Sequence, residues 1–242
     1  MTLPLFFGAS LIAFGPLLSL LYLVVLKRSQ LTIIALCSAW VFMMAFIFSS
    51  VVWAVVKPLQ SVYAYVMATS VIFQTICRFG IVKLYYYSYR KLLKVSSNSG
   101  VSSTGAQILP FSELSAAVSV GVGTAGTYCF IIYGHVGSKT LGPGTIYLET
   151  CPTMSLYILH ACLCCAMSLL HIMWSILSFD AWNRKSFVRG FVILVSHSAA
   201  VFATLFNGRK DGCIYSIITE IILVVVVGGW TSIVIHRSAN DQ

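Results

Sequence analysis

The stretch that decides the fold is MSLYILHACLCCAMSLLHIMWSILSFDAWNRKSFVRGFVILVSHSAAVFATLF, Met154 to Phe206. It consists of two apolar runs on either side of the polar segment SFDAWNRKSF. Each run is close to the roughly 20 residues that a helix needs to cross the hydrocarbon core of a bilayer. His171 lies inside the first run and His197 inside the second. A histidine is costly in hydrocarbon unless it has a hydrogen-bond partner or a wet cavity, so the pair is a candidate site.

The composition of the chain excludes a soluble globular domain. Of its 242 residues 59% are hydrophobic and only 9% are charged, and the mean hydropathy is +0.93. A soluble domain carries about 25% charged residues. The formal net charge of +9 would indicate nucleic acid as a partner of a soluble protein, but here the basic residues lie mostly in short loops between apolar runs. We therefore expect a polytopic membrane protein that contacts the lipid bilayer and no nucleic acid.

The length rule divides the chain into seven apolar segments, which we expect to form one transmembrane domain over residues 1–242. The fold class is all-α, because the short alternating pattern of a membrane β-barrel is missing. The first run is too long for a signal-peptide core, so we expect it to be retained as a span. The seven expected spans are approximately 4–26, 31–56, 61–84, 114–133, 154–179, 187–206 and 213–236.

Three of the loops between the spans allow a structural prediction from their residues. The tight turn Lys27–Gln30 predicts that the first two spans are antiparallel neighbours. The Ser/Gly-rich run SSNSGVSSTG, Ser96–Gly105, has little to bury, and we expect it to be mobile. LGPG, Leu141–Gly144, cannot continue a helix and is expected to fold against the membrane face.

The distribution of Lys and Arg predicts the orientation. With the N-terminus on the lumenal or extracellular side, ten basic residues fall in cytosolic segments and four on the other side. Cytosolic segments of membrane proteins are enriched in basic residues, so we expect a cytosolic C-terminus. The ten are Lys27, Arg28, Lys83, Arg90, Lys91, Lys94, Arg184, Lys185, Arg189 and Arg237, and the four are Lys57, Lys139, Arg209 and Lys210.

His171 and His197 are expected to lie at the same depth. Both are roughly 12 to 15 Å from the cytosolic end of their spans, at about 1.5 Å per residue. On antiparallel neighbouring helices they can meet, directly or through a water, and tie the fifth and sixth spans to a third element. His160 is about 16 Å from His171 along the axis, too far to share a metal ion with it. We predict a structural polar cluster, with no metal and no cofactor.

The third and last spans carry further polar residues. Gln74 and Arg78 are four residues apart and share a helix face, and both are candidate buried polar residues that bind a partner. The amide of Gln74 needs partners on another helix, and the alternative for Arg78 is that it extends toward the interface. Glu220 in the last span is expected to face a wet lumenal cleft.

Small residues mark the fourth span as a packing helix. Gly121, Ala125 and Cys129 recur every four residues, a pattern on which another helix backbone can approach closely. Gly123 and Gly126 have no side chains, so the adjoining face of this helix is also small.

Six of the eight cysteines fall inside apolar spans, where cysteine behaves as a small hydrophobe. Cys151 and Cys213 lie near span ends on the same side; whether they form a disulfide stays open at this point. No span contains an Asp, so an aspartyl protease dyad is excluded, and no zinc-protease, serine-hydrolase or phosphate-binding motif occurs. We find no catalytic set.

At these residues the chain resembles the anterior pharynx-defective family, the seven-span scaffold subunit of gamma-secretase. The two histidines with FDA between them are the most specific part of the resemblance. The matching pieces are FFGASLIAFGP at Phe6–Pro16, SSVVW at Ser49–Trp53, Gln74 with CRF at Cys77–Phe79, KLLK at Lys91–Lys94, LGPG at Leu141–Gly144, LLHIMWS at Leu169–Ser175, FDA at Phe179–Ala181, and SH at Ser196–His197.

The resemblance implies a non-catalytic subunit, a multi-pass protein of endoplasmic reticulum, Golgi and plasma membrane. Its implied partners are nicastrin, presenilin and the presenilin enhancer subunit, and its complex cleaves type I membrane proteins such as Notch and amyloid precursor protein. The resemblance assigns His171 and His197 to presenilin binding and the family's glycine motif to Gly121, Ala125 and Cys129. Thr75 stands where the family has an acidic residue, and YYYSYR is an extra stretch before KLLK.

Two other classes stay open. A seven-span receptor would agree with the number and orientation of the spans, but its D-R-Y and N-P-x-x-Y motifs are missing. A proton-coupled transporter would use the buried histidines as a relay, although the internal repeat of many transporters is missing as well.

Overall fold

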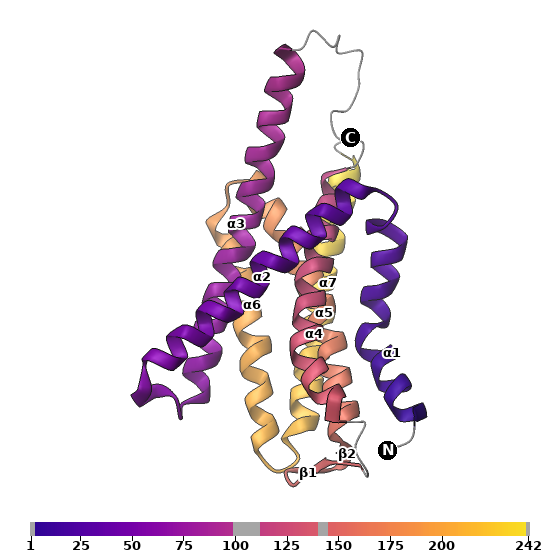
Figure 1. Ribbon diagram of the computed structural model, residues 1–242, viewed down its shortest axis with the longest axis vertical. Helices are drawn as coiled ribbons and strands as arrows, with labels where there is room; N and C mark the ends of the chain where they lie inside the picture. Colours follow the sequence, from indigo (N-terminus) through magenta and orange to yellow (C-terminus); the bar gives the residue numbers. More distant parts are fainter. Residues whose placement is uncertain (1–2, 99–111, 140–144, 241–242) are drawn as a thin grey trace.

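The structure is a computed structural model that describes residues 3–98, 112–139 and 145–240. Seven helices in these ranges are long and apolar enough to cross a membrane, as the hydropathy pattern predicts (Figure 1). They are α1 (Leu3–Leu20), α2 (Ser29–Val55), α3 (Tyr63–Asn98), α4 (Glu113–Lys139), α5 (Leu156–Asn183), α6 (Phe187–Ala203) and α7 (Gly212–Asn240). Three shorter helical segments accompany them: η1 (Leu21–Val25) continues α1, η2 (Lys57–Leu59) lies between α2 and α3, and η3 (Thr204–Gly208) continues α6.

The fold is not purely helical, because a small hairpin precedes α5. Its two antiparallel strands are β1 (Tyr147–Leu148) and β2 (Cys151–Ser155). The fifth helix therefore begins at Leu156, two residues after the approximate start of the expected span. Ser155 ends the strand and caps the helix, since its hydroxyl accepts a hydrogen bond from the backbone N–H of Ile158 at 3.4 Å. The hairpin lies at the end of the bundle where α1 begins (Figure 1).

The third helix is longer than predicted. Its expected end was Leu84, but α3 continues to Asn98 and projects beyond the other helices at the end opposite the hairpin (Figure 1). The hydropathy falls after Leu84, yet no Gly or Pro occurs between Leu84 and Asn98, and Tyr, Lys, Arg and Leu are all compatible with a helix. The start of the Ser/Gly-rich run is thus helical, while the rest of that run and all of Leu141–Gly144 lie outside the described residues.

Helix α4 separates α1 from α2, so the prediction that the first two spans are antiparallel neighbours is wrong. Beyond their turn, α1 packs mainly on α5 and α4, and α2 packs on α4 and α3. The small residues of α4 explain this arrangement: a Cβ on Gly126 would lie 3.7 Å from Leu17 of α1, and the Thr127 hydroxyl donates to the carbonyl of Ala39 in α2 at 3.2 Å. Small side chains let α4 approach both helices at once.

The outer surface of the bundle is apolar. Leu36 of α2, Phe191 of α6 and Val225 of α7 are each more than 60% exposed, and other large apolar side chains accompany them. A surface of this kind is unfavourable in water but is the expected lipid-facing surface of a membrane bundle. Several polar residues of the spans lie in the interior instead, among them Gln74, Arg78, His171, His197 and Glu220.

Candidate functional site

The two histidines meet inside the bundle. The short turn after α5 makes α5 and α6 antiparallel neighbours, and the centroids of the His171 and His197 rings lie 5.3 Å apart with the rings nearly perpendicular. Both side chains are fully buried. The indole of Trp174 lies against both rings, at centroid distances of 5.4 Å from His171 and 4.5 Å from His197, and donates to the hydroxyl of Ser196 at 2.9 Å. The indole thereby fixes the spacing of α5 and α6.

Arg78 of α3 is the third element of this cluster. Its guanidinium Nη2 lies 2.7 Å from Nδ1 of His171 and its Cζ lies 5.4 Å from the centroid of the Trp174 ring. The alternative that Arg78 extends toward the interface is wrong, because its side chain is fully buried. At this level α3 packs against α5 and α6, and Phe79 lies 3.3 Å from the position of a Cβ on Gly190. Neighbouring helices, and not lipid, therefore surround Arg78.

The bond between Arg78 and His171 determines the protonation of the imidazole. A guanidinium only donates hydrogen bonds, so Nδ1 of His171 must accept, and the ring proton of a neutral His171 must be on Nε2. No partner for Nε2 of His171, for either ring nitrogen of His197, or for Nε and Nη1 of Arg78 is found among the described residues. The cluster therefore keeps several buried donors free.

Gln74 lies apart from this cluster, at the wall of a cavity. Its amide nitrogen donates to the Ser70 hydroxyl at 2.8 Å. This partner lies on the same helix, whereas the prediction was a partner on another helix. No described residue bonds its amide oxygen. The cavity has a volume of about 460 Å³ and is lined by side chains from α2 to α6, including Ser49, Ser70, Gln74, Tyr128, His160, Met167 and Asn207.

The small residues of α4 face two helices. A Cβ on Gly121 would lie 2.7 Å from Cα of Ile172 in α5, and one on Gly123 would overlap the Ala35 carbonyl oxygen in α2. Ala125 and Cys129 are fully buried, and the Cys129 thiol lies 3.6 Å from the carbonyl oxygen of Cys164. Gly126 has more space around it, because a Cβ at this position would lie 3.7 Å from the nearest side-chain atom, Cδ2 of Leu17 in α1.

Glu220 does not face a wet cleft, so that expectation is wrong. The side chain is 1% exposed, and neither carboxylate oxygen has a hydrogen-bond partner within the described part of the chain. Helix α7, which carries Glu220, packs against α5 and α6.

Cys151 and Cys213 form a disulfide, which answers the question that the sequence leaves open. Their Cα atoms are 6.2 Å apart, and the bond joins β2 to the start of α7. Two hydrogen bonds support the same connection. The Thr150 hydroxyl donates to the Asn207 carbonyl at 2.7 Å, and the Asp211 N–H donates to the Thr150 carbonyl at 2.8 Å. The hairpin is thus fixed to the loop between α6 and α7, and Asn207 of that loop also lines the cavity.

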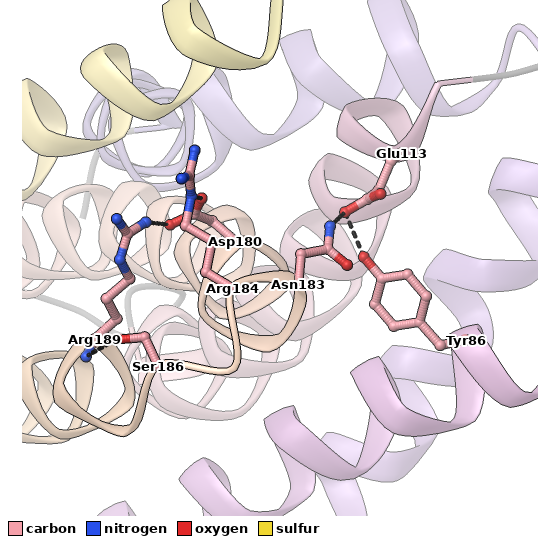
Figure 2. Close-up of polar contacts among 7 residues, drawn as sticks. All are labelled: Tyr86, Glu113, Asp180, Asn183, Arg184, Ser186 and Arg189. Atoms are coloured by element: carbon pink, nitrogen blue, oxygen red, sulfur yellow. Dashed lines mark hydrogen bonds and ion pairs between the residues drawn. The ribbon is translucent and has the colours of Figure 1, made fainter. Parts of the chain in front are cut away.

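A second polar cluster lies at the opposite end, which sequence reasoning did not identify as a site. Figure 2 shows Glu113 of α4 accepting hydrogen bonds from Tyr86 of α3 and Asn183 of α5. In the same figure the Asp180 carboxylate forms ion pairs with Arg184, at 2.8 Å, and with Arg189. The only signal in the sequence was the FDA tripeptide that contains Asp180. These contacts connect α3, α4, α5 and α6 at their ends.

These features define a seven-helix membrane protein with a buried polar cluster in its centre. No group of three His, Cys, Asp or Glu side chains in the described ranges could hold a metal ion.

The chain belongs to the Aph-1 family, whose model, described as "Aph-1 protein", matches residues 4–238. The resemblance drawn from the sequence motifs is thereby confirmed.

Similar proteins occur in animals and plants. The putative gamma-secretase subunit APH-1C of Mus musculus is 28% identical over 251 residues, covering 100% of this chain and 92% of that protein. Gamma-secretase subunit APH-1B of Homo sapiens is 27% identical, over 95% of this chain and 88% of that protein. The gamma-secretase subunit APH1-like of Arabidopsis thaliana is 25% identical, over 90% of this chain and 87% of that protein. The similarity therefore extends through nearly all of each chain.

Proposed function

We propose that this protein is the non-catalytic scaffold subunit of a gamma-secretase complex. In this role it holds presenilin and nicastrin together with the presenilin enhancer subunit, and so supports cleavage of type I membrane proteins such as Notch and amyloid precursor protein. The relatives that match it over most of their length are named gamma-secretase subunits. Such a protein acts in the endoplasmic reticulum, the Golgi and the plasma membrane.

The observation that carries the proposal is the cluster of Arg78, His171 and His197. It connects α3, α5 and α6 through one hydrogen bond and several ring contacts. Its only close polar pair joins a guanidinium to an imidazole, and neither group is an activated nucleophile. An arrangement of this kind fixes helices relative to one another, which is what a scaffold requires.

We further propose that the N-terminus is lumenal and the C-terminus cytosolic. The Cys151–Cys213 disulfide supports this orientation, because disulfides form in oxidising compartments and this one lies at the end where α1 begins (Figure 1). Most basic loop residues lie at the other end. An N-glycosylation sequon inserted after Thr145 in the full-length protein should be glycosylated, whereas one added after Gln242 should not. The reverse pattern would contradict the orientation.

Capture of presenilin tests the scaffold role. Cells that lack their own Aph-1 proteins are supplied with tagged wild-type protein, His171→Asn or His197→Asn, and membranes are solubilised in a mild detergent. Asparagine keeps a polar side chain but cannot reproduce the ring contacts with Trp174. We expect each variant to recover several-fold less presenilin fragment and nicastrin at equal abundance of the tagged protein.

The matched control is His236→Asn, at an exposed position near the end of α7. It should capture wild-type amounts of both partners. Unchanged capture by the His171 and His197 variants at normal expression would refute the role of the cluster. Failure of the wild-type protein to capture either partner would refute the scaffold function itself.

A further inference from the structure

An apolar groove runs between α2 and α3 at the end of the bundle opposite the hairpin (Figure 1). It has a volume of about 340 Å³, and Val120 of α4 also lines it. Along α3 the lining extends from Ile81 to Leu92, about 16 Å at 1.5 Å per residue, and along α2 it extends from Gln30 to Cys37. Cys37 and Leu92 are exposed, so the groove opens to the outer surface of the bundle.

Aromatic residues mark the membrane boundary at this end. The ring of Tyr86 stacks on that of Trp182, with the centroids 6.4 Å apart, and Tyr85 lines the groove. Tyr and Trp are enriched where a membrane protein passes from hydrocarbon to water. Lys91 follows Tyr86 by five residues and lies about 7.5 Å further along the axis, which is the depth of the lipid headgroups. The groove therefore runs from the acyl chains of the bilayer to its headgroups.

Positive charge collects at the headgroup end of the groove. Lys27 and Arg28 directly precede α2, whose Gln30 lines the groove, and Lys91 lies next to the last lining residue of α3. All three basic side chains are exposed, and no described carboxylate forms an ion pair with them. An apolar groove with a positive end is complementary to a lipid that has apolar chains and an anionic headgroup.

We propose that this groove binds one anionic phospholipid, such as phosphatidylserine. One acyl chain packs between α2 and α3, and Lys91 and Arg28 donate hydrogen bonds to the headgroup. Phosphatidylcholine fits the apolar part equally well, but its headgroup has no net charge for the basic residues to bind. The lining residues Tyr85, Ser88 and Tyr89 belong to YYYSYR, the stretch that the family pattern does not contain. The inference goes beyond the scaffold function and does not depend on it.

Cys37 provides the probe, because it is a free, exposed cysteine in the lining of the groove. The purified full chain in detergent is treated with N-ethylmaleimide at rising concentrations of phosphatidylserine or phosphatidylcholine, and peptide mass spectrometry follows the alkylation of Cys37. We expect phosphatidylserine to slow alkylation in a saturable manner and phosphatidylcholine to require several-fold more lipid. Glycerophosphoserine, which has the same headgroup without acyl chains, should not protect Cys37.

Three results would overturn the proposal. Equal protection by both phospholipids would exclude selection of an anionic headgroup. Protection by glycerophosphoserine would exclude an acyl chain as the group that covers Cys37. Alkylation that no phospholipid slows would exclude a lipid in the groove.

A matched pair of variants tests the charge at the end of the groove. Lys91→Gln should raise the phosphatidylserine concentration for half-maximal protection about fivefold, the equivalent of about 1 kcal/mol for one basic residue near an anionic lipid surface. The control is Lys83→Gln, an equal loss of charge on the same helix. Lys83 is two residues from both Ile81 and Tyr85 of the lining, which places it on the other side of α3. Equal midpoints for the two variants would contradict a headgroup site at Lys91.

A third variant tests the apolar part of the groove. Ser88→Trp fills the groove and leaves every basic residue in place. In native mass spectrometry of the full chain with phosphatidylserine, this variant should retain several-fold less lipid than the wild type. Retention at the wild-type level would show that the lipid binds elsewhere on the bundle and would overturn the proposal.

Discussion

Replacement of Gly123 by alanine is expected to force α2 away from α4. The new Cβ would overlap the Ala35 carbonyl oxygen and the Ser38 hydroxyl. The Ser38 hydroxyl donates to the Val120 carbonyl at 3.1 Å and so bonds the two helices directly. A backbone carbonyl cannot rotate out of the way, so the helices must separate and this hydrogen bond must lengthen.

The expected loss of stability combines three contributions. Overpacking in a tightly packed interior costs about 1 to 3 kcal/mol. Loss of a hydrogen bond between membrane helices adds roughly 0.6 to 1.7 kcal/mol. Alanine is a better helix former than glycine by at most about 1 kcal/mol, which offsets part of the loss. The Gly123→Ala protein should therefore be about 1 to 4 kcal/mol less stable than the wild type.

Reversible unfolding in mixed micelles with increasing SDS measures this difference. The matched control is Gly126→Ala, on the same helix, where the nearest atom to the new Cβ is Cδ2 of Leu17 at 3.7 Å, an ordinary van der Waals distance. The control should be as stable as the wild type or slightly more stable. Free energies of unfolding for Gly123→Ala and Gly126→Ala that agree within about 0.5 kcal/mol, the usual effect of a neutral substitution, would refute the close-approach argument.

Three further changes test other contacts. The Cys151→Ser, Cys213→Ser protein should lose at most about 4 kcal/mol, the chain-entropy value for a separation of 62 residues, and dithiothreitol should affect the unfolding of the wild type but not of this variant. Ser155→Ala removes the cap of α5 and should cost about 1 kcal/mol in SDS unfolding, whereas Ser155→Asp should not. Asp180→Asn removes two ion pairs and should lower the unfolding midpoint more at low salt than at high salt; an equal loss at both would contradict an electrostatic contribution.

The sequence predicts the seven helices well because a simple physical requirement, about 20 apolar residues, selects them. It predicts their ends less well where that requirement no longer applies. Helix α3 continues to Asn98 because a helix outside the bilayer needs only favourable backbone propensities. The pairing of Cys151 with Cys213 depends on a hairpin whose fold is not encoded in the spacing of the cysteines.

The sequence predicts the site only in part, because residue counting gives the depth of a side chain but not its direction. Depth along a helix follows from residue counting, and it placed His171 and His197 at one level. The direction in which a side chain points depends on which helices pack around it, and counting does not give that. The depth of Arg78 permits both a buried position and extension toward the interface, and the packing of α5 and α6 against α3 leaves it buried. Glu220 was expected to face a wet cleft because of its depth in the last span, and it is buried instead.

The packing face of α4 and the polar cluster form one structural unit, although the sequence shows them as separate features. Gly121 allows α4 to touch the backbone of Ile172, the residue next to His171. That approach holds the His171 ring between Phe42 and Tyr128, with ring centroids 5.1 Å away on each side, and within reach of Arg78. A larger residue at Gly121 would therefore displace α5 and the cluster together. A larger residue at Gly123 would instead displace α2, and with it Phe42, which packs against the His171 ring.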